Sequence, residues 1–199
     1  PSPGETPLLH SPVIVGSGPA GLFCGWYLAK AGYCPIILER GEEAEKRQKT
    51  VENFWKNGVL DPESNVQFGE GGAGTFSDGK LNTLVKDPYG RNHEVLKRFV
   101  AAGAPEEIIY QQKPHLGTDV LVGIVEKMRH EIEEMGGKFC FRSKVTDLIF
   151  ENNTLKEIEI NNDKRIPAQV CVLAPGHSAR DTFEMLQKRG VYMEPKSFA

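Results

Sequence analysis

The sequence predicts an α/β fold built on a parallel sheet, and three observations predict it. A short β-branched run, Val13–Val15, ends in a glycine-rich turn that leads into a helical pattern. A second apolar run, 35–38, follows that pattern and completes a β-α-β unit. Short strand patterns separated by asparagine turns fill the last third of the chain. We therefore expect a parallel sheet joined to a β-meander, with helical insertions.

The turn after the first strand carries the G-x-G-x-x-G pattern with Gly16, Gly18 and Gly21. In this pattern the first glycine permits a tight turn, the second lets the backbone approach a pyrophosphate, and the third permits close helix packing. The helix that begins near Pro19 and Ala20 offers N–H groups and a partial positive charge to the phosphates. The pattern predicts a Rossmann-like unit that binds a dinucleotide.

The remainder of this unit agrees with that prediction. Gly32 is placed to end the first helix. Glu39 stands at the carboxyl end of the second strand, about 20 residues after the turn, where an acid accepts hydrogen bonds from a ribose. Arg40 and Arg47 are candidate contacts to a ribose or phosphate. The alternative for Arg47 is a solvated face of a charged helix over 42–56.

Composition excludes some classes of partner. A net charge of −3 over 199 residues argues against a surface for nucleic acid. The chain has no apolar run of about 18 residues and no basic, apolar leader, so we expect no membrane segment and no secretory signal. Its four cysteines form no metal-ligand spacing, which favours buried free thiols and a cytoplasmic location. These are Cys24, Cys34, Cys140 and Cys171.

A second glycine-rich segment covers residues 68–80. Its glycines permit positive φ angles and leave backbone N–H groups available for a ligand. The alternative is a flexible surface loop, but Phe76 and Leu81 are typical of an anchored segment. We expect this loop to line the ligand. Its candidate contacts are Gly71, Gly72, Ala73, Gly74 and Lys80, with Ser77 and Asp78 beside them.

Two helical patterns follow the glycine loop. The first covers Val95 to Val100, and the second covers 121–135, with Thr118 or Asp119 placed to cap it. His115 lies in the loop before this cap. It is a candidate catalytic residue, but a hydrogen-bonded structural histidine is the favoured interpretation.

Strands are predicted over the last third of the chain. Residues 144–151, 154–160 and 165–173 are separated by asparagine turns, which predicts an antiparallel meander after a strand at 138–142. The run ending at Leu173 leads into Ala174-Pro175-Gly176, and ligands bind at such carboxyl ends of a parallel sheet. An NAD-dependent dehydrogenase continues through regular β-α-β units, so the meander favours FAD.

The predicted organisation is a linker over 1–11 and one FAD-binding domain over 12–199. This domain has an insertion at 42–135 and the meander at 144–173.

These motifs resemble a known superfamily. Gly16 to Gly21 followed by Glu39-Arg40-Gly41 resembles the FAD-binding signature of the two-dinucleotide-domain flavoproteins related to glutathione reductase. Ala174-Pro175-Gly176 is similar to their second Ala-Thr-Gly motif and departs from it at Pro175. More narrowly, four segments together resemble the bacterial FAD-dependent dehydrogenases of uncharacterised substrate. They are 65–68 with the glycine loop, 81–83, 114–119 and 176–181.

The resemblance implies roles for particular residues. Glu39 would hold the adenosine ribose, the backbone of Val145 would pair with adenine, and the loop at 69–80 would follow the flavin. Ala174 and Gly176 would belong to the second motif. The superfamily's later Gly-Asp motif does not follow Gly176, so we expect a fragment of a longer enzyme that can be inactive alone.

The predicted function is an FAD-dependent oxidoreductase that transfers a hydride between FAD and an unknown small substrate. NAD(P)H is a candidate electron donor or acceptor, and Lys80 is a candidate to stabilise negative charge on the reduced ring. No residue is identified as a general base. Two alternatives stay open, namely a non-catalytic FAD-binding or regulatory module and an NAD(P)-binding Rossmann protein.

Overall fold

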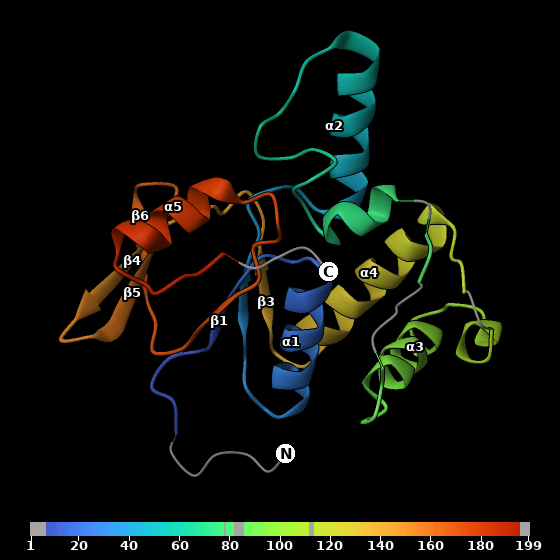
Figure 1. The fold of residues 1–199 in the computed structure, drawn as a ribbon, viewed down its shortest axis with the longest axis horizontal. Coiled ribbons are helices and arrows are strands. Elements are labelled where there is room, and N and C mark those ends of the chain that lie inside the picture. The colour runs from blue at the N-terminus through green and yellow to red at the C-terminus, as the bar shows by residue number, and fades with distance from the viewer. Residues whose placement is uncertain (1–6, 78, 82–85, 112–113, 196–199) are drawn as a thin grey trace.

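A four-stranded parallel sheet and a three-stranded antiparallel meander organise the chain (Figure 1). The computed structural model describes residues 7–77, 79–81, 86–111 and 114–195. The strands are β1 Val13–Val15, β2 Ile36–Leu38, β3 Lys138–Cys140, β4 Val145–Glu151, β5 Thr154–Ile160, β6 Lys164–Pro167 and β7 Cys171–Leu173. The helices are α1 Pro19–Lys30, α2 Ala44–Asn57, α3 Arg91–Ala101, α4 Thr118–Glu134 and α5 Arg180–Lys188, with 3₁₀ helices η1 Gly72–Phe76 and η2 Glu106–Ile109.

The parallel sheet has the order β3-β2-β1-β7. Val13 of β1 pairs with Ile36 of β2 on one side and with Cys171 of β7 on the other. The four strands are each three residues long and pair in parallel without an offset, so their carboxyl ends lie at the same edge of the sheet. The mixed α/β class with a Rossmann-like sheet is therefore confirmed.

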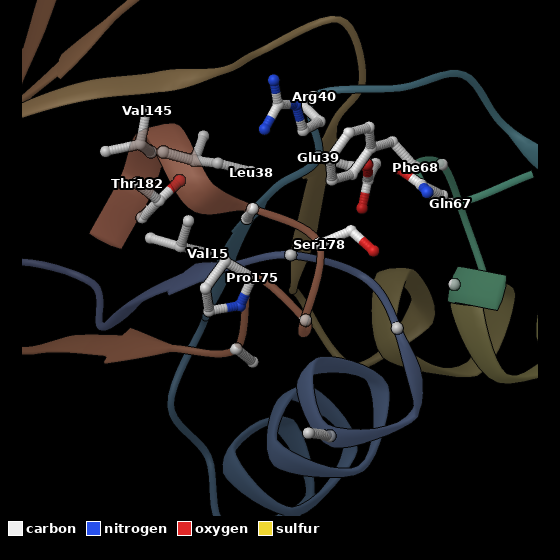
Figure 2. Close-up of a pocket in the computed structure, with 18 of the residues that line it drawn as sticks. Val15, Leu38, Glu39, Arg40, Gln67, Phe68, Val145, Pro175, Ser178 and Thr182 are labelled. Atoms are coloured by element: carbon white, nitrogen blue, oxygen red, sulfur yellow. The ribbon is translucent and has the colours of Figure 1, made fainter. Parts of the chain in front are cut away.

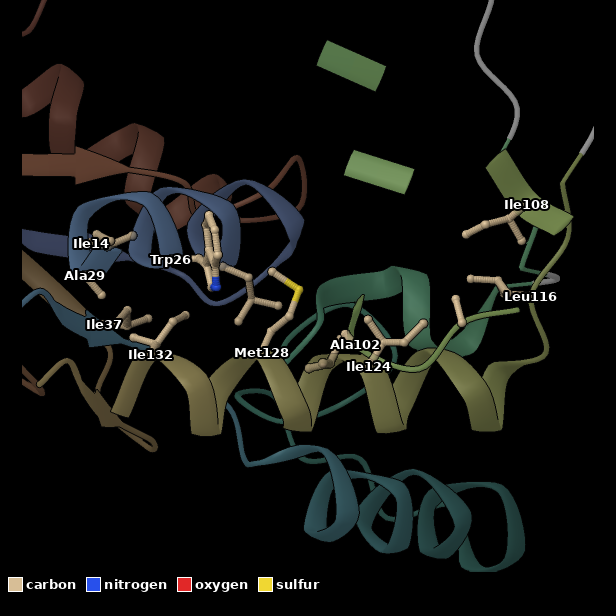
Figure 3. Packing of buried hydrophobic residues seen from close by; sticks show 13 residues of the cluster. Ile14, Trp26, Ala29, Ile37, Ala102, Ile108, Leu116, Ile124, Met128 and Ile132 are labelled. Carbon is tan, nitrogen blue, oxygen red and sulfur yellow. The ribbon is translucent and has the colours of Figure 1, made fainter. Parts of the chain in front are cut away.

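The sheet separates two apolar cores because successive side chains of a strand point to opposite faces. Ile14 and Ile37 pack with α1 and α4 in the first core, where Trp26, Met128 and Ile132 join them (Figure 3).

The second core lies on the opposite face. Val13, Val15 and Leu38 pack there against Leu148 of the meander and Leu186 of α5, among others. The sheet is consequently covered by helices on one face and by the meander and α5 on the other.

The meander forms as predicted through its asparagine turns. Asn152 and Asn153 have φ angles of 50° and 58°, and Asn161 and Asn162 have 55° and 57°. Two successive positive φ angles are the requirement of a type I′ hairpin turn, and asparagine tolerates them better than most residues. These turns connect β4 to β5 and β5 to β6.

The single strand predicted over 165–173 is wrong, because this run forms two strands in different sheets. β6 belongs to the meander, whereas β7 joins the parallel sheet. Pro167 ends β6 and has no N–H to continue a ladder. The N–H of buried Ala168 donates to the carbonyl of Lys156, and the carbonyl of Val170 then accepts from Val13. The chain crosses between the sheets at these residues.

Two local predictions also need correction. Gly117, rather than Thr118 or Asp119, occupies the N-cap position of α4, and no described side chain makes a capping hydrogen bond there. Asp119 instead lies in the first turn, where a carboxylate complements the helix dipole. All four cysteines are free, but Cys34 is exposed and the others are only half-buried.

The segments outside the two sheets contain the described helices. Helices α2, α3 and α4 lie between β2 and β3, and α2 projects away from the rest (Figure 1). Residues 7–11 of the predicted linker form no helix or strand, and the N–H groups of Leu9 and His10 both donate to Gln169 Oε1. Within the described residues, no helix has the length and apolar character needed to cross a membrane.

Candidate functional site

A cavity of about 280 Å³ lies at the carboxyl edge of the parallel sheet (Figure 2). Glu39, Arg40 and Phe68 lie together on one side of it, and Val145 and Thr182 lie on the other. Of the residues predicted to contact a cofactor, eleven line this cavity. They are Gly16, Gly18, Pro19, Ala20, Glu39, Arg40, Gly72, Ala73, Val145, Ala174 and Gly176.

The three glycines of the turn after β1 differ in what surrounds them. A Cβ on Gly16, whose φ is +98°, would lie 2.3 Å from the carbonyl oxygen of Ala174. A Cβ on Gly21 would lie 1.9 Å from the carbonyl oxygen of Gly16, so this glycine lets α1 pack on the turn. For Gly18 the nearest such atom is Gly72 Cα at 3.9 Å. Of these three glycines, Gly18 alone has room for a Cβ, and it lines the cavity.

The N-terminus of α1 adjoins this part of the cavity. Pro19 is the first residue of the helix, and no described side chain caps it or places a negative charge in its first turn. The first N–H groups of a helix have no partner within it and carry a partial positive charge. This end of α1 can consequently bind an anionic group.

Glu39 is buried at the base of the cavity, and the backbone holds its carboxylate in place. Its Oε2 accepts hydrogen bonds from the N–H of Ser17 at 2.9 Å and from Ser17 Oγ at 2.8 Å. Its Oε1 accepts from the N–H of Gly41 at 2.9 Å. A carboxylate has about four acceptor positions. Three are therefore used, and one on Oε1 remains for a ligand hydroxyl.

Arg47 differs from its prediction because it is fully buried and does not line the cavity. Its guanidinium donates to the carbonyls of Asn65, Val66, Glu70 and Gly72, and to Thr75 Oγ1, over 2.8–3.0 Å. Burial lowers the pKa of Arg47 to about 10, while the charges of Glu39 and Glu70 act in the opposite direction. Arg47 supports the glycine loop from beneath instead of contacting a ribose or phosphate directly.

Arg40 stands at the rim of the cavity within a network of charges. Its guanidinium binds both carboxylate oxygens of Asp181 at 2.9 Å and Glu63 at 2.6 Å, and it lies 4.0 Å from the centre of the Phe68 ring. Lys144 completes the network through Glu63 at 2.9 Å and Asp181 at 2.7 Å. Burial acts against the charge of Arg40, but the hydrogen bonds that Arg40 donates to Asp181 and Glu63 raise its pKa.

The remaining predicted contacts lie elsewhere. Gly21 is packed beneath the turn, and Gly71, Gly74 and Lys80 line a second, smaller cavity on the other side of the glycine loop. The loop itself is anchored, because the N–H of Gly71 donates to the carbonyl of Ser17 at 2.9 Å. Asp78, Asn82 and Thr83 lie outside the described residues.

His115 pairs with Lys80 in an antiparallel bridge, and its side chain is exposed. The N–H of Leu116 donates to the carbonyl of Gly79 and the N–H of Leu81 donates to the carbonyl of Pro114. This pairing ties the end of the glycine loop to the segment before α4. His115 lines neither of these two cavities.

Sequence reasoning missed several residues of the site. Ser17 was an unspecified position of the glycine pattern, yet its N–H and hydroxyl both bind Glu39. A Cβ on Gly41 would lie 2.6 Å from Gly69 Cα, so this glycine lets the glycine loop approach β2. Nothing in the sequence indicated that Phe68 and Asp181 would contact Arg40. Among the described residues, no group of histidine, cysteine or acidic side chains could hold a metal ion.

The fold and this site define a Rossmann-like nucleotide-binding unit, and comparison with known proteins agrees. Residues 14–53 match the family model described as an NAD(P)-binding Rossmann-like domain. An uncharacterized protein from Clostridium beijerinckii is 52% identical over 196 residues, which cover 98% of this chain. They cover only 36% of that relative, so the chain spans about a third of its length.

Solved structures share the fold. THI4 from Thermovibrio ammonificans superposes with a TM-score of 0.58 at 21% identity, over 92% of this chain and 63% of that one. A structure of OTEMO in complex with FAD and NADP gives a TM-score of 0.52 at 14% identity, over 84% of this chain and 25% of that one. At these identities the likeness shows a common fold.

Proposed function

We propose that the chain forms the adenosine- and pyrophosphate-binding part of an FAD-dependent oxidoreductase that acts on a small substrate. The observation that carries the proposal is the placement of Glu39 at the base of a cavity shared by the α1 N-terminus and Val145 of the meander. The fold shared with OTEMO, whose structure contains FAD and NADP, supports it. NAD(P)H is the proposed electron donor or acceptor.

The residues that line the cavity fit the adenosine and pyrophosphate parts of an FAD molecule. Gly18 leaves its backbone open beside the α1 N-terminus, which suits a pyrophosphate. Glu39 has one acceptor position for a ribose hydroxyl, and a second hydroxyl would replace the hydrogen bond from Ser17 Oγ. The backbone of Val145 is the proposed partner of adenine. When bound, the flavin supplies the hydride chemistry, while the protein orients it.

The test is nucleotide binding by the purified protein and by Glu39→Gln. We expect a yellow flavin that denaturation releases as FAD. The amide of Glu39→Gln can no longer accept from both Ser17 and Gly41, so FAD affinity should fall by about 10²-fold. Glu45→Gln, which changes an exposed carboxylate on α2, should leave FAD affinity unchanged.

Reduction of the flavin decides whether the module is catalytic. Under anaerobic conditions, NADH, NADPH or a substrate should bleach the flavin absorbance. A bound flavin that no physiological donor reduces would instead support the non-catalytic FAD-binding or regulatory module.

The family model favours a second candidate, an NAD(P)-binding protein, through its description over residues 14–53. This candidate predicts a colourless protein that releases NAD or NADP on extraction. Identification of the released nucleotide therefore separates the two proposals.

A further inference from the structure

A second cavity, of about 140 Å³, lies on the other side of the glycine loop from the first. Leu22 and Phe23 of α1, Phe99 of α3, and Leu121 and Met128 of α4 form its walls. The loop separates the two cavities, because Gly72 lines the first and Gly71 and Gly74 line the second, while Pro19 lines both. A ligand here would be a close neighbour of one held in the first cavity.

The described polar side chains of this lining are occupied within the loop or exposed. Thr75 Oγ1 donates to the carbonyl of Gly72 at 3.1 Å and accepts from Arg47 at 3.0 Å. Ser77 Oγ donates to the carbonyl of Gly74 at 2.8 Å and accepts from the N–H of Gly79 at 3.2 Å. Lys80 is exposed. A polar ligand group that bound Thr75 or Ser77 would have to displace bonds that hold the loop, and most other side chains of the lining are apolar, so the cavity favours an apolar group.

We infer that this cavity binds an uncharged aryl or branched-alkyl group of the substrate, an inference that rests on the proposed oxidoreductase function. Its size supports this class of group. An engineered apolar cavity of about 150 Å³ stays dry and binds benzene, which makes a single six-membered ring a suitable occupant here. The Phe23 and Phe99 rings, 5.8 Å apart between centroids, offer it aromatic contacts.

Toluene is the probe, and methyl NMR of the purified protein is the measurement. Toluene should shift the methyl signals of Met128 and Ile124, which line the cavity, and leave those of Ile158 and Leu186 in the second core unchanged. Signals that stay unshifted at Met128 and Ile124 would overturn the inference.

A pair of glycine variants tests the location. Gly74 and Gly123 both lie outside the left-handed region, and a Cβ on either meets nothing within 4 Å. Gly74→Leu adds a side chain to the lining of the cavity and should weaken toluene binding at least tenfold. Gly123→Leu, on the exposed side of α4, should not. Equal weakening by both variants would overturn the inference.

An enlarged cavity gives the converse test if Gly74→Leu does not fold. Phe99→Ala removes one aromatic wall and should admit naphthalene, which the unchanged protein should bind at least tenfold more weakly. Equal naphthalene affinity in both proteins would count against the assigned cavity. FAD binding is measured in the same samples by flavin fluorescence. Toluene binding by a protein without flavin binding would support the apolar site and overturn the oxidoreductase proposal.

Discussion

The turn after β1 and the glycine loop over 69–80 are both rich in glycine, but glycine serves different needs in them. In the turn, Gly16 and Gly21 allow backbone atoms of the fold to approach one another, and of these three glycines only Gly18 has room for a Cβ. In the loop, a Cβ on Gly69 would lie 2.3 Å from Arg47 Cδ, and one on Gly79 would lie 1.6 Å from the Leu116 carbonyl oxygen. Gly69 and Gly79 thus allow the loop to pack closely on Arg47 and Leu116, whereas Gly74 is not crowded in this way. Close packing within the chain therefore explains several of these glycines without any bound ligand.

The largest effect is expected where the loop rests on Arg47. Arg47→Met removes five hydrogen bonds and leaves the buried carbonyl of Glu70 and three part-buried carbonyls without this donor. We expect a loss of about 3–5 kcal/mol in the free energy of unfolding, measured by urea denaturation. The control is Arg91→Met, an exposed arginine at the start of α3, which should change stability by less than about 0.5 kcal/mol. Equal stability of the two variants would show that the loop does not depend on Arg47.

A matched pair of alanine variants should separate structural from ligand-facing glycine in the turn. Gly16→Ala places a Cβ against Ala174 at a positive φ, and should cost about 2–3 kcal/mol in thermal unfolding without cofactor. Gly18→Ala meets no close atom and should leave unfolding within about 0.5 kcal/mol. Its expected effect is weaker FAD binding, because the methyl group occupies the space proposed for the pyrophosphate. Unchanged FAD affinity in Gly18→Ala would contradict that placement.

The smallest effect is expected at Asp181, which joins the rim of the cavity to Arg40. Burial raises the pKa of Asp181, but hydrogen bonds from Arg40 and Lys144 more than offset this and lower it well below its ordinary value of 3.8. A carboxyl with a lowered pKa in the folded state contributes stability above its unfolded pKa and loses that contribution as the pH falls further.

The corresponding variant is Asp181→Asn. The wild-type protein should lose about 1 kcal/mol more than the variant between pH 5 and strongly acidic conditions, a small value because the Asp181 side chain is 42% exposed. Urea denaturation at several pH values measures this difference. Glu184→Gln, an exposed position of the same helix, should keep the wild-type pH dependence.

The β-α-β unit could be predicted from the sequence because its signals are local. The strand ending at Val15 and the helix beginning at Pro19 are indicated by neighbouring residues, and Glu39 follows at the end of the next strand of the same unit. The asparagine turns of the meander are local in the same sense. These elements form where predicted.

The surroundings of Arg47 could not be predicted, because they depend on carbonyls brought together by the fold. Nothing near Arg47 in the sequence indicates that Asn65, Val66 and Gly72 converge on its guanidinium. The split of the run over 165–173 has the same origin. Its residues all favour extended backbone, and only the partners of β6 and β7 distinguish the two strands.

The pairing of β1 with β7 has a consequence for the order of folding. β1 and β2 are joined by one helix, so their pairing closes a short loop, whereas the pairing of Val13 with Cys171 closes a loop of nearly the whole chain. Contacts so distant in sequence form slowly. Ala174 and Gly176 directly follow β7, so the cavity gains its last wall when this strand docks. Refolding should therefore restore helical content before it restores nucleotide affinity.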